Sequence, residues 1–209
     1  MIPVKICGLT RAEDACLAWA LGASGLGFVF HPASPRAVTP RHVREIRREL
    51  PPEAFCIGVF VDMDPDRVND IAMEAGLNAV QLHGRELPET CAAIPLPIIK
   101  AIRGEDARRL EDYAVSAFLL DAAHPTLAGG TGLKADWTLA ARIARQRPLF
   151  LAGGLNPGNI LNATEHVRPA GLDVCSGVEA APGVKDAGLL KSLLARTTLK
   201  GERPCLLPR

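Results

Sequence analysis

The chain has 209 residues, 48% of them hydrophobic, which is enough to bury a sizeable core in one domain or two small ones. Its 24 basic and 23 acidic side chains give a formal net charge of +1, so no global field attracts nucleic acid or an anionic membrane. Aromatic residues are only 4% and no apolar run approaches the length of a membrane span, so we expect neither nucleic acid nor membrane as a partner.

Eight short apolar runs, many of them rich in β-branched residues, recur along the chain and predict β-strands. Several are apolar almost throughout instead of alternating, which is typical of parallel strands covered on both faces. In chain order they are VKIC at residue 4, GLGFVF at 25, FCIGVFV at 55, AVQL at 79, PIIKAI at 97, AFLLD at 117, PLFLAGG at 148 and GLDVCSG at 171.

Helical patterns with their own start and stop signals separate these strands. TRAE fits a capping box in which Thr10 reaches forward and Glu13 reaches back. A second helix is expected to begin at Pro40. DPDRVNDIAMEAG predicts a helix with Pro65 near its start and Gly76 just past its end.

The later connections give weaker signals. NPGNI places Asn156 as the cap of a helix, and the last helix is expected from about Lys185 to Thr197. LPETCAAI and DARRLEDY predict short helices, because little chain is left between their flanking strands.

A strand followed by a helix, eight times without a break in composition, predicts one closed (β/α)8 TIM barrel over residues 1–198. Residues 199–209 are then an irregular tail. A doubly wound open sheet stays open as an alternative, although no G-x-G-x-x-G follows the first strand to support dinucleotide binding.

In such a barrel the active site gathers at the C-terminal ends of the strands. Cys7 is either a small buried hydrophobic residue or a general base. In the second case, Lys5 or the start of the following helix would favour its thiolate form. Asp121 either caps a loop or acts as a general acid in a partly dry site. The residues expected at the strand ends are Cys7, Phe28, His31, Asp62, His83, Arg103, Asp121, Gly153, Gly154 and Ser176.

Two glycine-containing turns follow the last two strands, LAGGLNPGN and VCSGVE. Their backbone N–H groups favour a phosphate site, although ordinary tight turns would look the same.

Arg36 either clamps a carboxylate or is a solvated loop residue, and GGTG at 129–132 predicts a mobile loop. His31, His83 and His124 lack metal-ligand spacing, so we expect no metal.

The six cysteines include no C-x-x-C pair, and several lie in apolar stretches. The N-terminus also lacks the charged-then-apolar pattern of a signal peptide. We therefore expect reduced thiols in a cytoplasmic protein.

Taken together and in order, these motifs make the chain similar to the phosphoribosylanthranilate isomerase family of tryptophan biosynthesis. The similarity runs from Val4 to about Leu194 through KICGLT, GFVFHPASPR, GVFVD, AVQLHG, LLDA…GGTG…DW, LAGGLNPGN and DVCSGVE…PGVKD. It implies a (β/α)8 barrel that works without metal or organic cofactor. The implied reaction is the Amadori rearrangement of N-(5-phosphoribosyl)anthranilate, a small phosphorylated sugar–anthranilate substrate, by a monomer or homodimer.

The resemblance also implies a role for each matching residue. Cys7 would be the general base and Asp121 the general acid, and Arg36 would hold the anthranilate carboxylate. Two glycine turns would bind the phosphate, and two side chains of QLHG would line the pocket. These are Gly153, Gly154, Ser176 and Gly177 for the phosphate, with Gln81 and His83 for the pocket.

The sequence departs from the family at Cys175, where serine is more usual, and at GLKADW. The cysteine puts a hydroxyl contact to phosphate in question. One rival function is indole-glycerol-phosphate synthase, which would need a lysine acid such as Lys100. Another is a non-catalytic barrel that binds a phosphorylated sugar.

Overall fold

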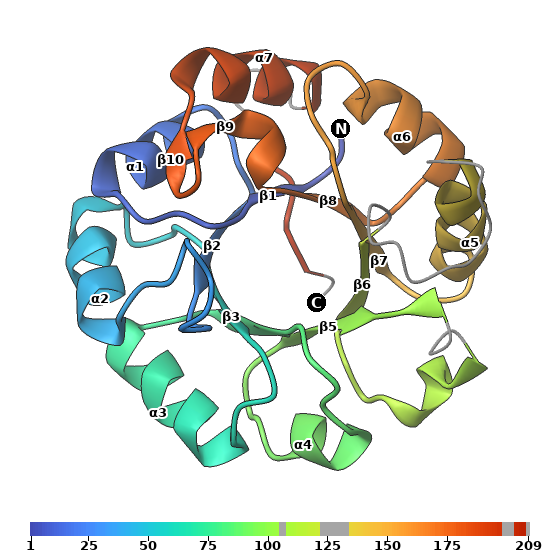
Figure 1. The fold of residues 1–209 in the computed structure, drawn as a ribbon, viewed down its shortest axis with the longest axis horizontal. Helices are drawn as coiled ribbons and strands as arrows, with labels where there is room; N and C mark the ends of the chain where they lie inside the picture. The colour runs from blue at the N-terminus through green and yellow to red at the C-terminus, as the bar shows by residue number, and fades with distance from the viewer. Residues whose placement is uncertain (105–107, 122–133, 198–202, 208–209) are drawn as a thin grey trace.

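Eight parallel strands form a closed barrel in the computed structural model, which describes residues 1–104, 108–121, 134–197 and 203–207 (Figure 1). Each strand pairs with the next, and β8 pairs with β1 to close the ring. The closed ring confirms the predicted barrel and rules out the open sheet. The strands are β1 (Val4–Ile6), β2 (Gly25–Val29), β3 (Cys56–Phe60), β4 (Ala79–Leu82), β5 (Ile98–Ile102), β6 (Ala117–Asp121), β7 (Leu149–Ala152) and β8 (Gly171–Val174).

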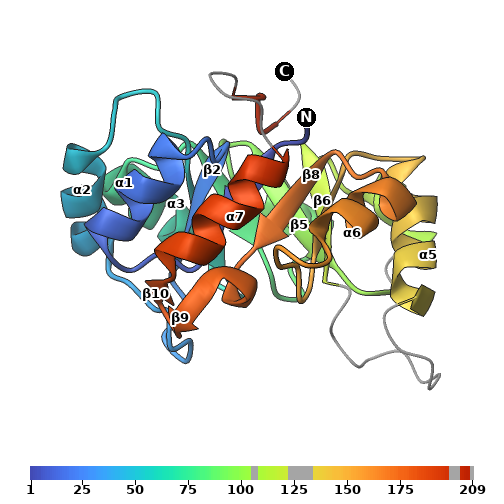
Figure 2. The same ribbon diagram turned by 90° about the horizontal axis from the view of Figure 1, so that it is seen from above.

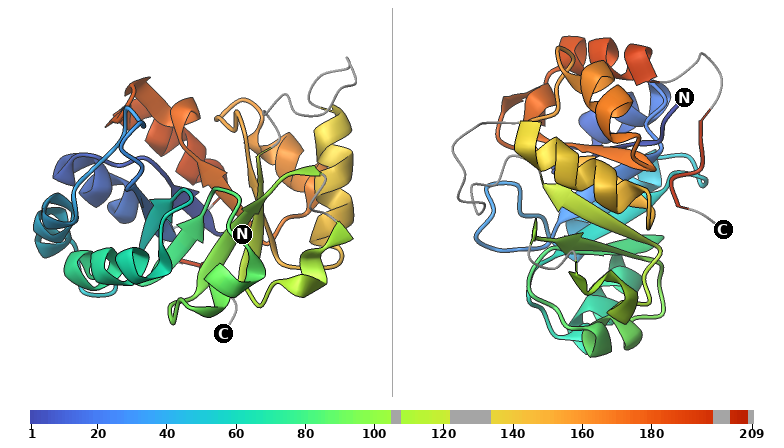
Figure 3. Two further views of the ribbon diagram at one scale, coloured as in Figure 1. Left: turned by 60° about the horizontal axis from the view of Figure 1, so that its bottom comes forward. Right: turned by 90° about the vertical axis from the view of Figure 1, so that its right-hand side faces the viewer.

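Helices surround the barrel, and neighbouring helices such as α5 and α6 lie side by side along its flank (Figure 3). Past β8 the chain makes a small antiparallel pair, β9 (Glu179–Ala181) with β10 (Val184–Lys185). The helices are α1 (Ala12–Ala20), α2 (Pro40–Glu49), α3 (Pro65–Ala75), α4 (Pro88–Ala92), α5 (Lys134–Ala144), α6 (Ile160–Val167) and α7 (Ala187–Thr197), with 3-10 turns η2 (Leu110–Asp112) and η3 (Ser176–Val178).

Helix α3 shows why local signals predicted some boundaries well. The side chain of Asp64 caps it by accepting from the backbone N–H of Asp66 at 2.9 Å, and Pro65 occupies its first turn. It ends at Gly76, whose φ of +66° is the left-handed conformation that favours glycine. Helix α2 likewise begins at Pro40 as predicted.

The predicted capping box at Thr10 is wrong. Helix α1 begins at Ala12 after Arg11, and no side chain caps it. The Thr10 hydroxyl instead donates to the carbonyl of Gly183 at 2.6 Å, so a contact between distant parts of the chain replaces the local one.

Three further predicted helix details need correction. Asn156 accepts from the N–H of Gly158 in a turn, and α6 begins only at Ile160. The last helix begins at Ala187, because Lys185 belongs to β10. In DARRLEDY, residues 106 and 107 lie outside the described chain, and the described remainder contains only 3-10 structure, at Arg108 and in the turn η2, instead of an α-helix.

The expected irregular tail has a clear position. Its described residues 203–207 contain no helix or strand, and Figure 2 shows the tail at the same end of the barrel as the N-terminus. Leu206 and Leu207 are 4% and 7% exposed and join the apolar cluster inside the barrel with Ile57 and Phe150. Gly25 leaves room for them, since a Cβ there would lie 2.6 Å from Leu206.

An arginine fixes the start of this segment. The guanidinium carbon of Arg203 lies 3.5 Å from the ring centre of Trp19, within the range of a cation–π contact. The same group donates to the backbone carbonyls of Trp19 at 2.6 Å and Ala23 at 3.0 Å. The segment therefore closes the barrel at the N-terminal ends of its strands.

If the tail closes the barrel, Leu206→Ala will lower the free energy of unfolding by at least about 2 kcal/mol, because it removes buried methyl groups and leaves a cavity. Leu189→Ala is the matched control, since Leu189 is 38% exposed and should change stability by less than about 0.5 kcal/mol. Urea unfolding measures both. Equal, small effects would show that the tail does not contribute to the core.

Candidate active site

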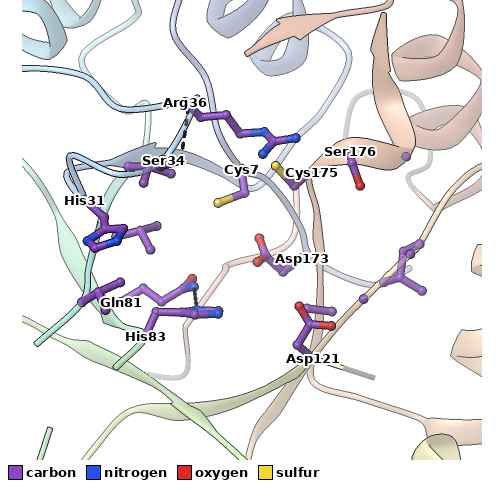
Figure 4. Close-up of a pocket in the computed structure, with 18 residues that line it drawn as sticks. Cys7, His31, Ser34, Arg36, Gln81, His83, Asp121, Asp173, Cys175 and Ser176 are labelled. Carbon is purple, nitrogen blue, oxygen red and sulfur yellow. Dashed lines mark hydrogen bonds between the residues drawn. The ribbon is translucent and has the colours of Figure 1, made fainter. Parts of the chain in front are cut away.

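A cavity of about 300 Å³ is lined by residues at the C-terminal ends of the strands, the end of the barrel opposite the one that the tail closes. All nine residues to which the resemblance assigned a role line this cavity (Figure 4). They are Cys7, Arg36, Gln81, His83, Asp121, Gly153, Gly154, Ser176 and Gly177. His31 lines the same cavity. The thiol of Cys7 and the carboxylate of Asp121 therefore face one space, although Cys7 follows β1 and Asp121 ends β6.

Three residues expected at the strand ends do not line the cavity. Phe28 is fully buried in the outer core between barrel and helices, because its neighbours Gly27 and Val29 take the inward positions of β2. Asp62 accepts from a backbone N–H in the next loop, and Arg103 is exposed. A run of apolar residues without alternation does not reveal which side chains point inward.

Lys100, the acid that the rival synthase would need, also lies outside the cavity. The residue is 3% exposed, and its ammonium group is ion-paired with Glu86 at 2.9 Å. It also donates to the carbonyl of Gly84 at 2.9 Å. These contacts hold Lys100 in a structural role, which disfavours the rival.

Cys7 follows β1 and is held by its own backbone. Its N–H donates to the carbonyl of Val174 at 2.8 Å, and the residue is 7% exposed. Gly27 on β2 gives the thiol space, because a Cβ there would lie 3.0 Å from the Cys7 sulfur and 2.9 Å from Cε of Lys5. The glycine is required by this close approach.

A buried polar network lies beneath the thiol. Lys5 is fully buried and donates to Asp173 at 2.8 Å and to Gln81 at 2.7 Å. Nε2 of Gln81 lies 2.8 Å from Nδ1 of His83, which continues the network to the cavity wall. Asp173 was missed by sequence reasoning, and its only signal was an acidic residue inside the apolar run GLDV.

This network keeps a positive charge next to Cys7. Burial alone lowers the pKa of Lys5, but the carboxylate of Asp173 and the sulfur of Cys7 outweigh it, so the pKa is raised overall. Lys5 is therefore a cation at neutral pH, and a buried cation requires partners of this kind.

The environment also prepares Cys7 as a base. The interaction of Cys7 with the Cys175 side chain is the largest influence, and with the charge of Lys5 it outweighs burial and the repulsion of Asp173 to lower the pKa of Cys7 to about 7. The same interaction and burial raise the pKa of Cys175, so Cys175 keeps its proton, and its thiol donates to Glu179 at 3.9 Å. A large fraction of Cys7 is then thiolate at neutral pH.

Arg36 is oriented by a carboxylate from the chain itself. Its Nε and Nη2 donate to the two oxygens of Glu179 at 2.9 and 2.6 Å, and Lys185 donates to Glu179 at 2.8 Å. Burial raises the pKa of Glu179, but these hydrogen bonds outweigh it and lower the pKa to about 2. Arg36 is thus bound bidentately by Glu179 of the same chain, and its contact with a substrate carboxylate stays a prediction.

Two turns form the remaining wall. Gly153 and Gly154 have φ of +95° and +63°, and a Cβ on Gly154 would meet nothing within 4 Å, so this backbone opens toward the cavity. Gly177 packs so closely on Leu155 that a Cβ there would overlap its carbonyl oxygen. Ser176, at the start of η3, is exposed. The backbone of these turns can approach an anionic ligand closely.

Some predicted features fall outside the described chain. The GGTG loop at 129–132 and His124 are among these residues. Within the described ranges, no group of three or more His, Cys, Asp or Glu residues is arranged to hold a metal ion. Among the helices described, none combines the length and apolar character that crossing a membrane requires.

A family model and a curated relative point to the same protein family. The family model for N-(5'-phosphoribosyl)anthranilate (PRA) isomerase matches residues 4–196. The N-(5'-phosphoribosyl)anthranilate isomerase of Pelobacter propionicus is 50% identical over 197 residues, which cover 93% of this chain and 94% of the relative.

Solved structures show the same similarity. A phosphoribosyl anthranilate isomerase in complex with reduced 1-(o-carboxyphenylamino)-1-deoxyribulose 5-phosphate has a TM-score of 0.82 and 42% identity, covering 93% of this chain and 97% of its own. Monomers made from the dimeric enzyme of Thermotoga maritima also have a TM-score of 0.82, with 40% identity, covering 95% and 100%.

The lowered pKa of Cys7 predicts its chemical reactivity. Alkylation of Cys7 by iodoacetamide will rise with pH around a midpoint of about 7, because only the thiolate reacts. Cys175→Ala removes the interaction with Cys7 and will move the midpoint to higher pH. Mass spectrometry of the peptide that carries Cys7 measures the rate. An unchanged midpoint in the variant would contradict the role given to Cys175.

Proposed function

Because the chain belongs to the N-(5'-phosphoribosyl)anthranilate isomerase family, we propose that it rearranges N-(5-phosphoribosyl)anthranilate to 1-(2-carboxyphenylamino)-1-deoxyribulose 5-phosphate with Cys7 as base and Asp121 as acid. The observation that carries the proposal is one cavity that contains a thiol of lowered pKa and a carboxyl group from another strand. The solved relative that holds the reduced product supports the choice of substrate.

The reaction divides between the two groups. Asp121 would protonate the ribose ring oxygen, so that the C1'–O bond breaks and leaves a protonated Schiff base. The Cys7 thiolate would then remove the proton from C2', giving an enolamine that tautomerises to the ketone. One group loses a proton and the other gains one, so exchange with solvent restores both and the isomerisation needs no redox partner.

The rest of the cavity would hold the two ends of the substrate. The backbone of Gly153, Gly154 and Gly177, with Ser176, would bind the phosphate. Arg36 would bind the anthranilate carboxylate through Nη1, since Nε and Nη2 are occupied by Glu179. Gln81 and His83 would line the pocket between these ends, a role that the hydrogen bond of Gln81 to Lys5 supports.

Location and assembly are part of the same proposal. All six cysteines are free thiols, which supports the reducing cytoplasm as the compartment. A dimeric relative supports a homodimer as one candidate state, with a monomer as the other. Gel filtration with light scattering distinguishes these two states.

Cys7→Ala and Asp121→Asn will each lower kcat by about 10²–10⁴-fold, because each removes one proton-transfer group. Loss of substrate fluorescence measures turnover, and circular dichroism checks folding. The controls are Cys16→Ala and Asp62→Asn, which carry the same changes outside the cavity. Activity retained in both active-site variants would instead favour the non-catalytic sugar-phosphate-binding barrel.

Arg36→Gln will raise KM by at least about 10-fold with a smaller change in kcat, because charge-assisted bonds to the substrate carboxylate are lost. Arg41→Gln is the control, since Arg41 forms only a surface pair with Glu45. Steady-state kinetics measures both. A KM that does not change in Arg36→Gln would assign the carboxylate to another group.

A further inference from the structure

Two cysteines stand side by side in the cavity. β1 pairs with β8 in the register Ile6 with Val174, and the N–H of Cys7 continues the ladder to the carbonyl of Val174 at 2.8 Å. Cys7 and Cys175 are the next residues of the two strands, and both line the cavity (Figure 4). Of the residues that the structure describes, the cavity is lined by no other cysteine.

The spacing of these residues suits a covalent bond between them. Neighbouring parallel strands lie about 4.8 Å apart, and a disulfide joins residues whose Cα atoms are about 4.4–6.8 Å apart. The Cys175 sulfur also lies against the residue after Cys7, since a Cβ on Gly8 would be 2.9 Å from it. The strand register therefore places the two cysteines within the backbone spacing that a disulfide bridges.

The charges around the pair favour oxidation in a fixed order. Cys7 supplies the thiolate, because Lys5 and the interaction with the Cys175 side chain stabilise it. Cys175 is half-buried beside it, in the position of a resolving thiol. Lys185 lies 4.0 Å from the Cys175 sulfur, where its positive charge favours the thiolate, and the carboxylate of Glu179, which accepts from the Cys175 thiol at 3.9 Å, opposes it. Oxidation of Cys7 removes the negative charge of its thiolate, and with it the largest influence that raises the pKa of Cys175.

We propose that hydrogen peroxide converts Cys7 and Cys175 to a reversible disulfide that switches the enzyme off, an effect on activity that rests on the proposed function of Cys7. The Cys7 thiolate attacks one peroxide oxygen, forming a sulfenic acid and releasing hydroxide. The Cys175 sulfur then attacks the Cys7 sulfur, so that an S–S bond forms, the S–O bond breaks and water leaves. Two thiols are oxidised, and one peroxide is reduced to two molecules of water.

The bond itself is tested without any activity assay. Tryptic digestion of the peroxide-treated full chain places Cys7 in residues 6–11 and Cys175 in residues 146–185, since Arg147 and Arg168 precede prolines. Mass spectrometry is expected to show these two peptides cross-linked, lighter by two hydrogen atoms and separated by dithiothreitol. Sulfinic or sulfonic acid on Cys7 with Cys175 still free, or no reaction at either residue, would overturn the proposal.

The switch is tested with Cys175→Ser, a conservative change that removes the resolving thiol. Each protein is compared with its own untreated activity, so any change in basal rate cancels. Without the resolving thiol of Cys175, a second molecule of peroxide oxidises the Cys7 sulfenic acid to a sulfinic acid and is reduced to water, and dithiothreitol does not reduce the sulfinic acid. After treatment with excess peroxide, dithiothreitol is therefore expected to restore most activity to wild type and to Cys205→Ser, whose exposed thiol lies outside the cavity, but little to Cys175→Ser. Equal recovery in all three would overturn the switch. If the cross-link formed in a protein that has no isomerase activity, the proposed function would be wrong while the proposed disulfide would still be supported.

Discussion

The buried ammonium group of Lys5 is the interaction on which the rest of the site depends. It lies inside the barrel with no exposed surface, where a charge is tolerated only with close partners, and Asp173 and Gln81 supply them at 2.8 and 2.7 Å. These bonds connect β1, β4 and β8 across the interior. They also place a fixed positive charge next to Cys7, so the group that ties the strands together also favours the thiolate.

The two ends of the barrel are built on opposite principles. At the N-terminal end, Leu206 and Leu207 complete an apolar cluster, so this end is closed by the chain itself. At the other end, polar groups restrain one another: Glu179 binds Arg36 and Lys185 and accepts from the Cys175 thiol at 3.9 Å. An apolar end stabilises the fold, while a polar end holds its side chains in the positions that chemistry requires.

Much of the fold was predictable because its signals are local. Apolar runs marked all eight strands, and the residues around Pro65 and Gly76 marked a helix correctly. Long-range contacts were not predictable, which is why Thr10 failed as a cap and the leucines of the tail received no role. Phe28 was misplaced because an apolar run without alternation hides which face is inward. Motifs brought the cavity residues together, but the network of Lys5 and Asp173 has no motif.

The central claim is that the Cys175 side chain and the buried cation of Lys5 together make Cys7, directly after β1, a base at neutral pH. The most direct measurement is the pH dependence of kcat/KM, whose acidic limb reports ionisation in the free enzyme. The account predicts a limb near pH 7 in the wild type, as the pKa of Cys7 requires, and a shift of this limb to higher pH in Lys5→Met. A limb at the same pH in both proteins would contradict it.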